Sequence, residues 1–370
     1  MDTSDVEKQI KNIEDEIFNT QKNKATEHHI GKLKAKLARL KAEIEKRKST
    51  GAKGKGFAIK KSGDATVGLI GFPSIGKSTL INRLTDAKSR VGSYDFTTLD
   101  AIPGMMSYKG ANIQILDLPG LITGASNGKG RGREILSAVR NVDLIIFMID
   151  AQNINQLDLM AQELHFAGIR VNQKKPDIVV KKTGHGGINV SFTVKLTHLD
   201  ETLVKSISSE YVTNAEIILR EDITEDQLID VFLQNRIYLP AFVVINKKDL
   251  INKKDLYLTT NNIKQKGWDV IAISARNRAG LKNLKEKIFS KLKFIRIYMK
   301  PVGKKADFDE PLILKENNTV EIACKKLHRN FKEKFRYASV SGPSAKHDIQ
   351  KVGLDHVLKD KDILTIVVTK

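Results

Sequence analysis

The sequence of 370 residues predicts an α/β protein with a mostly parallel sheet, a helical hairpin before it and a small separate domain after it. Three observations support this prediction. From residue 65 onward, short apolar segments alternate with helical segments. An amphipathic helical pattern fills residues 1–50, and the linker at 51–64 is rich in glycine and lysine. The alternation breaks at about residues 165–235, which predicts an inserted α+β domain.

In residues 1–50, apolar side chains recur every three or four positions and form two sets. The sets are Val6, Ile10, Ile13 and Ile17, then Ile30, Leu33, Leu37, Leu40 and Ile44. The polar interval between them favours an αα-hairpin over one long helix. The narrow apolar stripes either dock on another surface or pack within the hairpin, and both interpretations stay open.

Residues 65–292 contain five strand candidates, and each ends at a polar loop. They are "TVGLI", "ANIQILD", "VDLIIFMID", "AFVVI" and "WDVIAIS". Ligands of parallel sheets bind at the carboxyl ends of the strands, so we expect the functional site there.

The insertion and the C-terminal residues show smaller patterns. "KKTGHGGINVSFTV" at 181–194 predicts a hairpin turned by glycine, and "TEDQLIDVFLQN" at 224–235 predicts a capped amphipathic helix. Residues 293–370 predict a small domain of short strands around one helix at 319–331. We interpret four of its aromatic residues as core residues: Phe294, Tyr298, Phe331 and Phe335.

Composition limits the class of protein. The chain is 41% hydrophobic, its apolar runs are too short to span a membrane, and its N-terminus has no signal-peptide pattern. The single cysteine, Cys324, excludes an internal disulfide and fits a reducing compartment, so we expect a cytoplasmic protein in which this thiol is buried packing. The net charge of +20 indicates a polyanionic partner such as RNA, or a lysine-rich proteome.

The segment "GFPSIGKST" matches the phosphate-binding pattern G-x-x-x-x-G-K-[ST] between a strand and a helix. Its glycines let backbone N–H groups surround phosphate oxygens. Lys77 is placed to neutralise the β- and γ-phosphates, and the Ser78 hydroxyl is placed to bind Mg²⁺.

"NKKD" at 246–249 follows a strand and selects the base. A carboxylate at Asp249 can accept hydrogen bonds from guanine N1–H and N2–H₂, whereas adenine would leave it unpaired. The turn Ser274-Ala275 after the next strand can offer a backbone N–H to guanine O6.

Between these motifs lies "DLPG" at 117–120. Asp117 can hold Mg²⁺ through water, and Gly120 can present its N–H to the γ-phosphate. Upstream, the hydroxyl of Thr98 in "YDFTTLDAIPG" can complete the Mg²⁺ site. The order of the five elements indicates a GTP-binding protein.

With "GFPSIGKSTL", "YDFTTLDAIPG", "DLPGLITGASNGKGRGRE" and "NKKD", the chain resembles the developmentally regulated GTP-binding (DRG) proteins, a branch of the Obg-type P-loop GTPases. The end of the chain, "RIYMKP" to "VGLDHVLKDKDILTIV", resembles the TGS domain, a ubiquitin-like β-grasp module. The resemblance covers essentially the whole chain and includes the hairpin and the insertion. It implies slow GTP hydrolysis coupled to translation, association with ribosomes, and a dedicated partner protein that stabilises the GTPase.

Leu121 stands where many small GTPases have a glutamine that orients the attacking water. We therefore expect weak intrinsic hydrolysis, and Obg-type proteins are also apolar here. The missing role can come from a polar group in residues 92–98 or 123–133, from a partner, or from K⁺. Arg131 and Arg133 either supply transition-state charge or face solvent or ribosomal RNA, and both interpretations stay open. Ser74 stands where some potassium-using GTPases have an asparagine.

The expected site is as follows. The catalytic residues are Lys77, Thr98 and Gly120, and the Mg²⁺ residues are Ser78, Thr98 and Asp117. The residues expected to bind nucleotide are Gly71, Phe72, Pro73, Ser74, Ile75, Gly76, Lys77, Ser78, Thr79, Asp117, Gly120, Asn246, Lys247, Asp249, Ser274 and Ala275. The histidines His185 and His347 lie in loops away from these motifs, and we interpret them as solvated.

Two functions remain open: a ribosomal regulatory GTPase, and a nucleotide-gated binding module or RNA scaffold with negligible turnover. A P-loop kinase or ATPase is disfavoured by "NKKD". The N-terminal region and the TGS-like domain are the expected macromolecular contacts. Neither has an aromatic-rich platform, so we expect contact with RNA phosphates rather than with bases.

Overall fold

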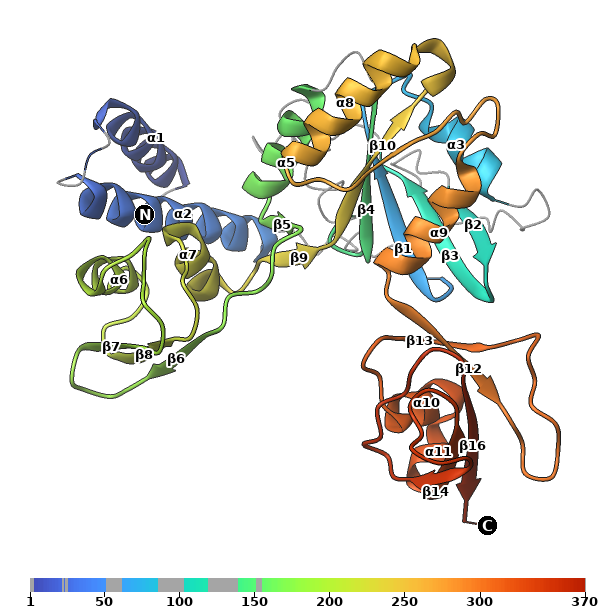
Figure 1. Ribbon diagram of the computed structural model, residues 1–370. Coiled ribbons are helices and arrows are strands. Elements are labelled where there is room, and N and C mark those ends of the chain that lie inside the picture. Colours follow the sequence, from blue (N-terminus) through green and yellow to red (C-terminus); the bar gives the residue numbers. More distant parts are fainter. Residues whose placement is uncertain are drawn as a thin grey trace. The chain divides into compact units, whose positions relative to one another are not determined.

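The computed structural model describes residues 3–21, 23, 26–50, 62–85, 103–118, 139–150 and 155–369 (Figure 1). Contacts divide the chain into two compact units. Unit 1 comprises Met1–Gly56 and Gln173–Tyr238, and unit 2 comprises Phe57–Asn172 and Leu239–Lys370. Within the described ranges, every helix is too short or too polar to cross a bilayer.

Unit 2 contains a six-stranded sheet in the order β11-β10-β4-β1-β3-β2. The strands are β1 (Ala65–Ile70), β2 (Pro103–Tyr108), β3 (Ala111–Asp117), β4 (Leu144–Asp150), β10 (Ala241–Asn246) and β11 (Val270–Ala272). The five expected strands run parallel, and β2 pairs antiparallel with β3 at the edge. The predicted α/β fold class is therefore confirmed.

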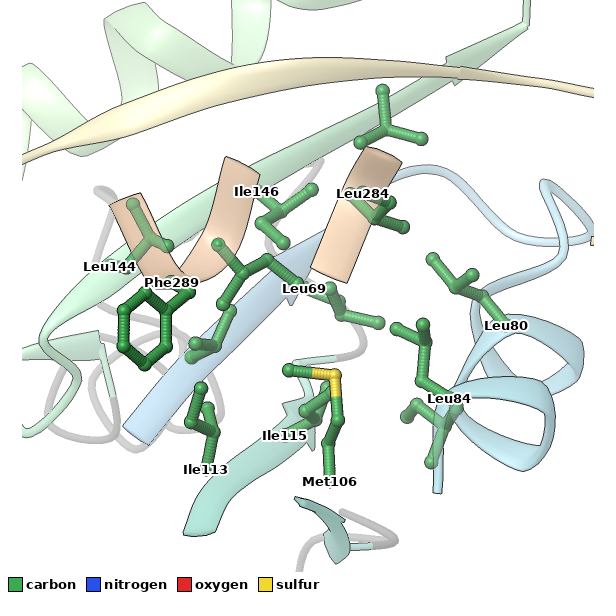
Figure 2. Packing of buried hydrophobic residues seen from close by; sticks show 14 of the residues in the cluster. Leu69, Leu80, Leu84, Met106, Ile113, Ile115, Leu144, Ile146, Leu284 and Phe289 are labelled. Carbon is green, nitrogen blue, oxygen red and sulfur yellow. The ribbon is translucent and has the colours of Figure 1, made fainter. Parts of the chain in front are cut away.

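The strands are apolar on both sides because helices cover both faces of a parallel sheet. On one face they pack against α3 (Lys77–Leu84) and α9 (Leu281–Lys291). Figure 2 shows this core, with Leu80 and Leu84 of α3 and Leu284 and Phe289 of α9 near the strand residues. The alternate strand residues are equally buried; α5 (Asn155–Phe166) contacts β4, and α8 (Lys253–Gln265) contacts β11.

Between β4 and β10 the polypeptide makes an excursion from the six-stranded sheet. The excursion begins after β5 (Ile169–Val171) and ends at β9 (Ile237–Leu239), and these two strands pair as a separate small sheet. Asn172 N–H donates to the Leu239 carbonyl at 2.9 Å, and the Asn172 side-chain oxygen accepts from Ala241 N–H at 2.7 Å. The two ends of the excursion are thus joined by hydrogen bonds.

Unit 1 consists of the N-terminal hairpin and the inserted segment, which pack together. Its helices are α1 (Thr3–Asn19), α2 (Glu27–Thr50), α6 (Glu201–Ser208) and α7 (Glu225–Leu233). The stripes of α1 and α2 pack against each other, so the hairpin is packed within itself. The other side of α2 meets the insertion: Ala35 lies in the core of α6 and α7, and Tyr211 Oη donates to its carbonyl at 2.8 Å. The predicted domain boundaries remain predictions.

The glycine-turned hairpin predicted at 181–194 is wrong. Strands β6 (Ile178–Lys182) and β7 (Ile188–Phe192) lie on opposite sides of β8 (Ala215–Leu219). β8 is the most apolar of the three and is mostly buried, so it takes the central position and pairs with both neighbours. The capped helix is confirmed, because Thr224 and Gln227 form a capping box at the start of α7.

The C-terminal domain has a five-stranded sheet in the order β13-β12-β16-β14-β15. Its strands are β12 (Phe294–Met299), β13 (Leu312–Lys315), β14 (Phe335–Ser341), β15 (Gln350–Val352) and β16 (Asp362–Val368). The single predicted helix is two, α10 (Val320–Leu327) and α11 (Arg329–Glu333). At His328 the backbone is extended, and this side chain accepts from Asn330 N–H and caps α11.

The four aromatic residues interpreted as core residues of this domain have different environments. Phe331 and Phe335 pack on its core, together with the buried Cys324. Phe294 instead joins the core cluster that contains α9 and β1. Tyr298 is only half-buried, and its ring lies 4.9 Å from that of the exposed Phe308. The interpretation of Tyr298 as a core residue is therefore wrong.

Candidate nucleotide-binding site

The loop between β1 and α3 is shaped by two glycines. A side chain on Gly71 would place its Cβ 2.6 Å from the Met148 carbonyl oxygen of β4. Gly76, the residue before α3, has a φ of 98°, and a Cβ there would lie 2.5 Å from Asn246 Nδ2. Because both positions exclude side chains, the backbone can pass close to its neighbours and leave its N–H groups free to face an anion.

Lys77 and Asp117 meet beneath this loop. Lys77 is 9% exposed, and its ammonium donates to the carbonyls of Gly71 at 2.8 Å and Phe72 at 3.2 Å. Asp117, at the carboxyl end of β3, lies 3.9 Å from this ammonium. Burial lowers the pKa of Lys77 and raises that of Asp117, and in each case the opposite charge of the pair works against burial.

The carboxylate of Asp117 is only partly satisfied. Its Oδ2 accepts from Ser78 Oγ at 3.3 Å, whereas Oδ1 is buried and has no hydrogen-bond partner among the residues that the structure describes. A buried carboxylate oxygen without a donor is costly, and a hard divalent cation with oxygen ligands is the group that satisfies it. Ser78 and Asp117 therefore fit Mg²⁺ held by a hydroxyl and, directly or through water, a carboxylate.

Asn246 connects the phosphate loop to the last loop of the site. It ends β10, is 3% exposed, and donates from Nδ2 to the Ile75 carbonyl at 2.8 Å. Its Oδ1 accepts from Ala275 N–H at 3.1 Å. Ser274 N–H donates to Ala279 at 3.0 Å, so both N–H groups of the Ser274-Ala275 turn are engaged. A guanine O6 at this turn would share the Ala275 N–H or displace Asn246 from it.

Lys247 and Asp249 of "NKKD" contact residues other than those that Asn246 binds. Lys247 has a φ of 59°, and its ammonium lies 3.7 Å from Asp150 Oδ2. Asp249 is exposed, and a hydrogen bond from the Ser274 side chain, the largest of several causes, lowers its pKa. Asp249 thus stays ionised and available as an acceptor.

The structure brings most of the predicted residues together around the carboxyl ends of β1, β3 and β10. Phe72 is half-buried and Ile75 is buried, while Pro73, Ser74 and Thr79 are exposed. Ser74 has a φ of 61°. Five residues discussed above fall outside the described ranges: Thr98, Gly120, Leu121, Arg131 and Arg133.

Sequence reasoning missed Asp150. It ends β4 directly beside Asn246 in the β4–β10 register, which brings it to Lys247. The available signal was its position at the carboxyl end of an apolar strand, the same position that Asp117 has on β3.

Comparison with protein families matches three consecutive segments of the chain. Residues 66–182 match the family described as 50S ribosome-binding GTPase. Residues 185–294 match the C-terminal region of that GTPase domain, and residues 295–368 match the TGS domain.

Relatives match over the whole length. An uncharacterized GTP-binding protein of Methanocaldococcus jannaschii is 52% identical over 100% of this chain and 94% of its own length. Developmentally-regulated G-protein 3 of Arabidopsis thaliana is 46% identical, covering 98% of this chain and 99% of the relative. Developmentally-regulated GTP-binding protein 2 of Homo sapiens is 45% identical, covering 97% and 98%.

Proposed function

Because this chain belongs to the family of developmentally regulated GTP-binding proteins, we propose that it is a slow cytoplasmic GTPase that acts on the ribosome. GTP binding and a P-loop GTPase fold follow from the family. The observation that most supports turnover in this chain is the cluster of Lys77, Ser78 and Asp117. In this cluster a buried cation lies beside a carboxylate whose Oδ1 receives no hydrogen bond from the described residues.

In the proposed site each residue has one role. Lys77 leaves its carbonyl partners for the β- and γ-phosphates, where its charge stabilises the transferred group. Ser78 and Asp117 hold Mg²⁺, and Thr98 joins them when the γ-phosphate is present. Gly120 donates its N–H to that phosphate. Mg²⁺ supplies charge neutralisation of the β- and γ-oxygens when bound.

The base site is proposed in the same way. Asp249 accepts from guanine N1–H and N2–H₂, and the low pKa of its carboxylate keeps it an acceptor at neutral pH. Lys247 lies along one side of the base, and Asn246 keeps the phosphate loop and the Ser274-Ala275 turn together.

Leu121 supports the slow rate, because a hydrocarbon side chain cannot orient water by hydrogen bonding. We propose that the missing role comes from outside this side chain: from K⁺ near Ser74, from the ribosome, or from a dedicated partner protein. The charge of +20 and the description of the matched GTPase family support the ribosome as the surface on which the protein acts.

The test is GTP turnover by the purified chain, alone and with ribosomes, in matched KCl and NaCl. We expect slow turnover alone and stimulation by ribosomes. Stimulation in KCl but not in NaCl assigns a role to K⁺, and equal rates remove it. Tight GTP binding without turnover in any condition contradicts the GTPase proposal and favours the second candidate, a nucleotide-gated binding module, for which Leu121 is the supporting observation.

A further inference from the structure

One face of the C-terminal sheet is not used by the nucleotide site. The helices α10 and α11 cover the opposite face, where the domain's core lies (Figure 1). At the edge near β13, Phe294 and Ile313 pack on the neighbouring core cluster. The remaining outward positions form what we call the open sheet face, and by strand register they are Arg296, Tyr298, Tyr337, Ser339, Ser341, Lys351, Ile363, Thr365 and Val367. All of them are half-buried or exposed.

Two tyrosines lie at different places on the open sheet face. Tyr298 is beside Ile363 on β16, and Tyr337 is beside Val367. The four-residue separation on β16 places the two rings about 13 Å apart along the strand. Phe308, 60% exposed, extends the Tyr298 ring, and the ammonium of Lys351 lies 5.0 Å from the centre of the Tyr337 ring. The two rings can therefore engage two separate planar groups.

The charges on this face have one sign. Both charged residues at its outward positions are cations, Arg296 and Lys351, and Lys300 lies two residues beyond Tyr298 on the same extended segment. Arg296 is neutralised by Asp360 at 2.7 Å. Asp307 and Asp309 flank Phe308, so carboxylates also lie near the Tyr298 end of the face. Within the described ranges no ion pair joins Lys300 or Lys351 to a carboxylate, so both ammonium groups are available to an anion.

We propose that the open sheet face binds single-stranded RNA, with bases stacked on Tyr298 and Tyr337 and phosphates held by Lys300 and Lys351. This deepens the proposed ribosomal function and rests on it. It departs from the expectation of contact with phosphates rather than bases, because only the sheet register brings Tyr298 and Tyr337 to the same face. A polar row separates the two rings: Ser339 pairs with Thr365 across the strands, and Ser341 lies next to Ser339 on the same side. Their hydroxyls can donate to phosphate or 2′-hydroxyl oxygens. A single strand is favoured over a duplex because only unpaired bases present a face to an aromatic ring.

The experiment measures binding of the full-length chain to a fluorescein-labelled twelve-nucleotide single-stranded RNA by anisotropy, at several KCl concentrations. The variants are Y298L/Y337L, which keeps side-chain bulk but removes both aromatic rings, and K300Q/K351Q. The matched control, K325Q/K332Q, removes the same charge from the helical face of the same domain. A hairpin RNA of equal length and inorganic polyphosphate serve as competitors.

We expect Y298L/Y337L to weaken binding about a hundredfold, because stacking on an aromatic side chain contributes about tenfold for each of the two bases. K300Q/K351Q should lower the slope of log affinity against log salt by about 1 to 2. The control should change neither by more than about twofold. The single strand should compete better than the hairpin or polyphosphate at equal phosphate concentration.

Equal losses in the control and the K300Q/K351Q variant overturn the proposal, as does binding that Y298L/Y337L leaves unchanged. Competition by the hairpin RNA or by polyphosphate that equals competition by the single strand also overturns it. GTP turnover and thermal unfolding of each variant are measured alongside. Normal turnover without RNA binding contradicts this inference alone, whereas RNA binding without turnover contradicts only the GTPase proposal.

Discussion

Asn246 fixes the relative position of two loops that are 200 residues apart in sequence. Its amide holds Ile75 of the phosphate loop and Ala275 of the last loop, and both bonds are buried. N246A leaves a buried carbonyl and a buried N–H without partners, each costing about 1–3 kcal/mol. We expect the free energy of unfolding to fall by about 2–4 kcal/mol and nucleotide affinity to fall more than tenfold. Denaturant unfolding and titration with a fluorescent GDP check this.

The control is N252A, which removes the side chain that caps α8 by accepting from Asp255 N–H. Loss of an N-cap costs about 1 kcal/mol. Nucleotide affinity should be unchanged in N252A. If it falls as far as in N246A, the bridge is not what holds the site together.

Asp249 presents two acceptor oxygens where the base is expected. D249N keeps one acceptor oxygen for N1–H and replaces the other by an N–H₂ donor, which faces guanine N2–H₂ without an acceptor but matches the carbonyl oxygen at C2 of xanthine. We expect GTP affinity to fall about thirtyfold or more, the equivalent of about 2 kcal/mol in hydrogen bonds to a charged group. XTP affinity should rise. Competition of GTP, XTP and ATP against labelled GDP measures all three, and an equal rise for ATP contradicts the assignment.

At the scale of elements, α10 and α11 are held together by Glu321, whose carboxylate contacts Lys325 at 2.9 Å and Lys332 at 2.6 Å. Hydrogen bonds from Lys332 and then Lys325 lower its pKa from 4.5 to about 2. Because the pKa is lower in the folded state, the stabilisation is complete above pH 4.5 and is lost as the pH falls toward 2.

E321Q should therefore lower the urea midpoint at neutral pH and make its decline between pH 5 and pH 2 shallower than in the unmodified chain. K325Q/K332Q should remove the same part of the pH dependence, and the triple variant should add little. Circular dichroism at several pH values measures the midpoints. An E321Q profile parallel to that of the unmodified chain contradicts the assignment.

The strands that carry the site could be predicted because a continuous run of apolar residues identifies a buried parallel strand even when its partner strand is unknown. Strands β6 and β7 could not be placed, since their common partner β8 follows more than 20 residues after β7 and no local pattern reveals it. The break at His328 depends on one extended residue within an otherwise helical pattern. The contact of Asp150 with Lys247 requires the register of β4 against β10, which only the folded sheet provides.

At the scale of the molecule, the division into two units predicts two unfolding transitions. The single tryptophan, Trp268, packs edge-on against Phe147 of β4 at 5.4 Å and reports only on unit 2. Nucleotide at a hundred times its dissociation constant should stabilise unit 2 by about 2.7 kcal/mol. The fluorescence transition should then shift upward, while circular dichroism should show a second transition that stays in place.

Coincident transitions by both probes, shifting together with GDP, would falsify the independence of the two units. A matched measurement with ATP in place of GDP controls for nonspecific effects of a polyanion. ATP should leave both transitions unchanged, because adenine has no donor pair for the carboxylate of Asp249 in the proposed base site.

The hydrogen bonds around Asn172 also have a consequence for how such a chain could have been assembled and can be re-engineered. Because Asn172 and Leu239 meet directly, everything from residue 173 to residue 238 departs from and returns to nearly one point. A two- or three-residue turn could close that gap without stretching β5 or β9. The six-stranded sheet can thus gain or lose residues 173–238 at this junction without altering its own strand order. The junction is a site for building chimaeras, in which the N-terminal hairpin must be exchanged together with the insertion because Ala35 of α2 lies in the same core.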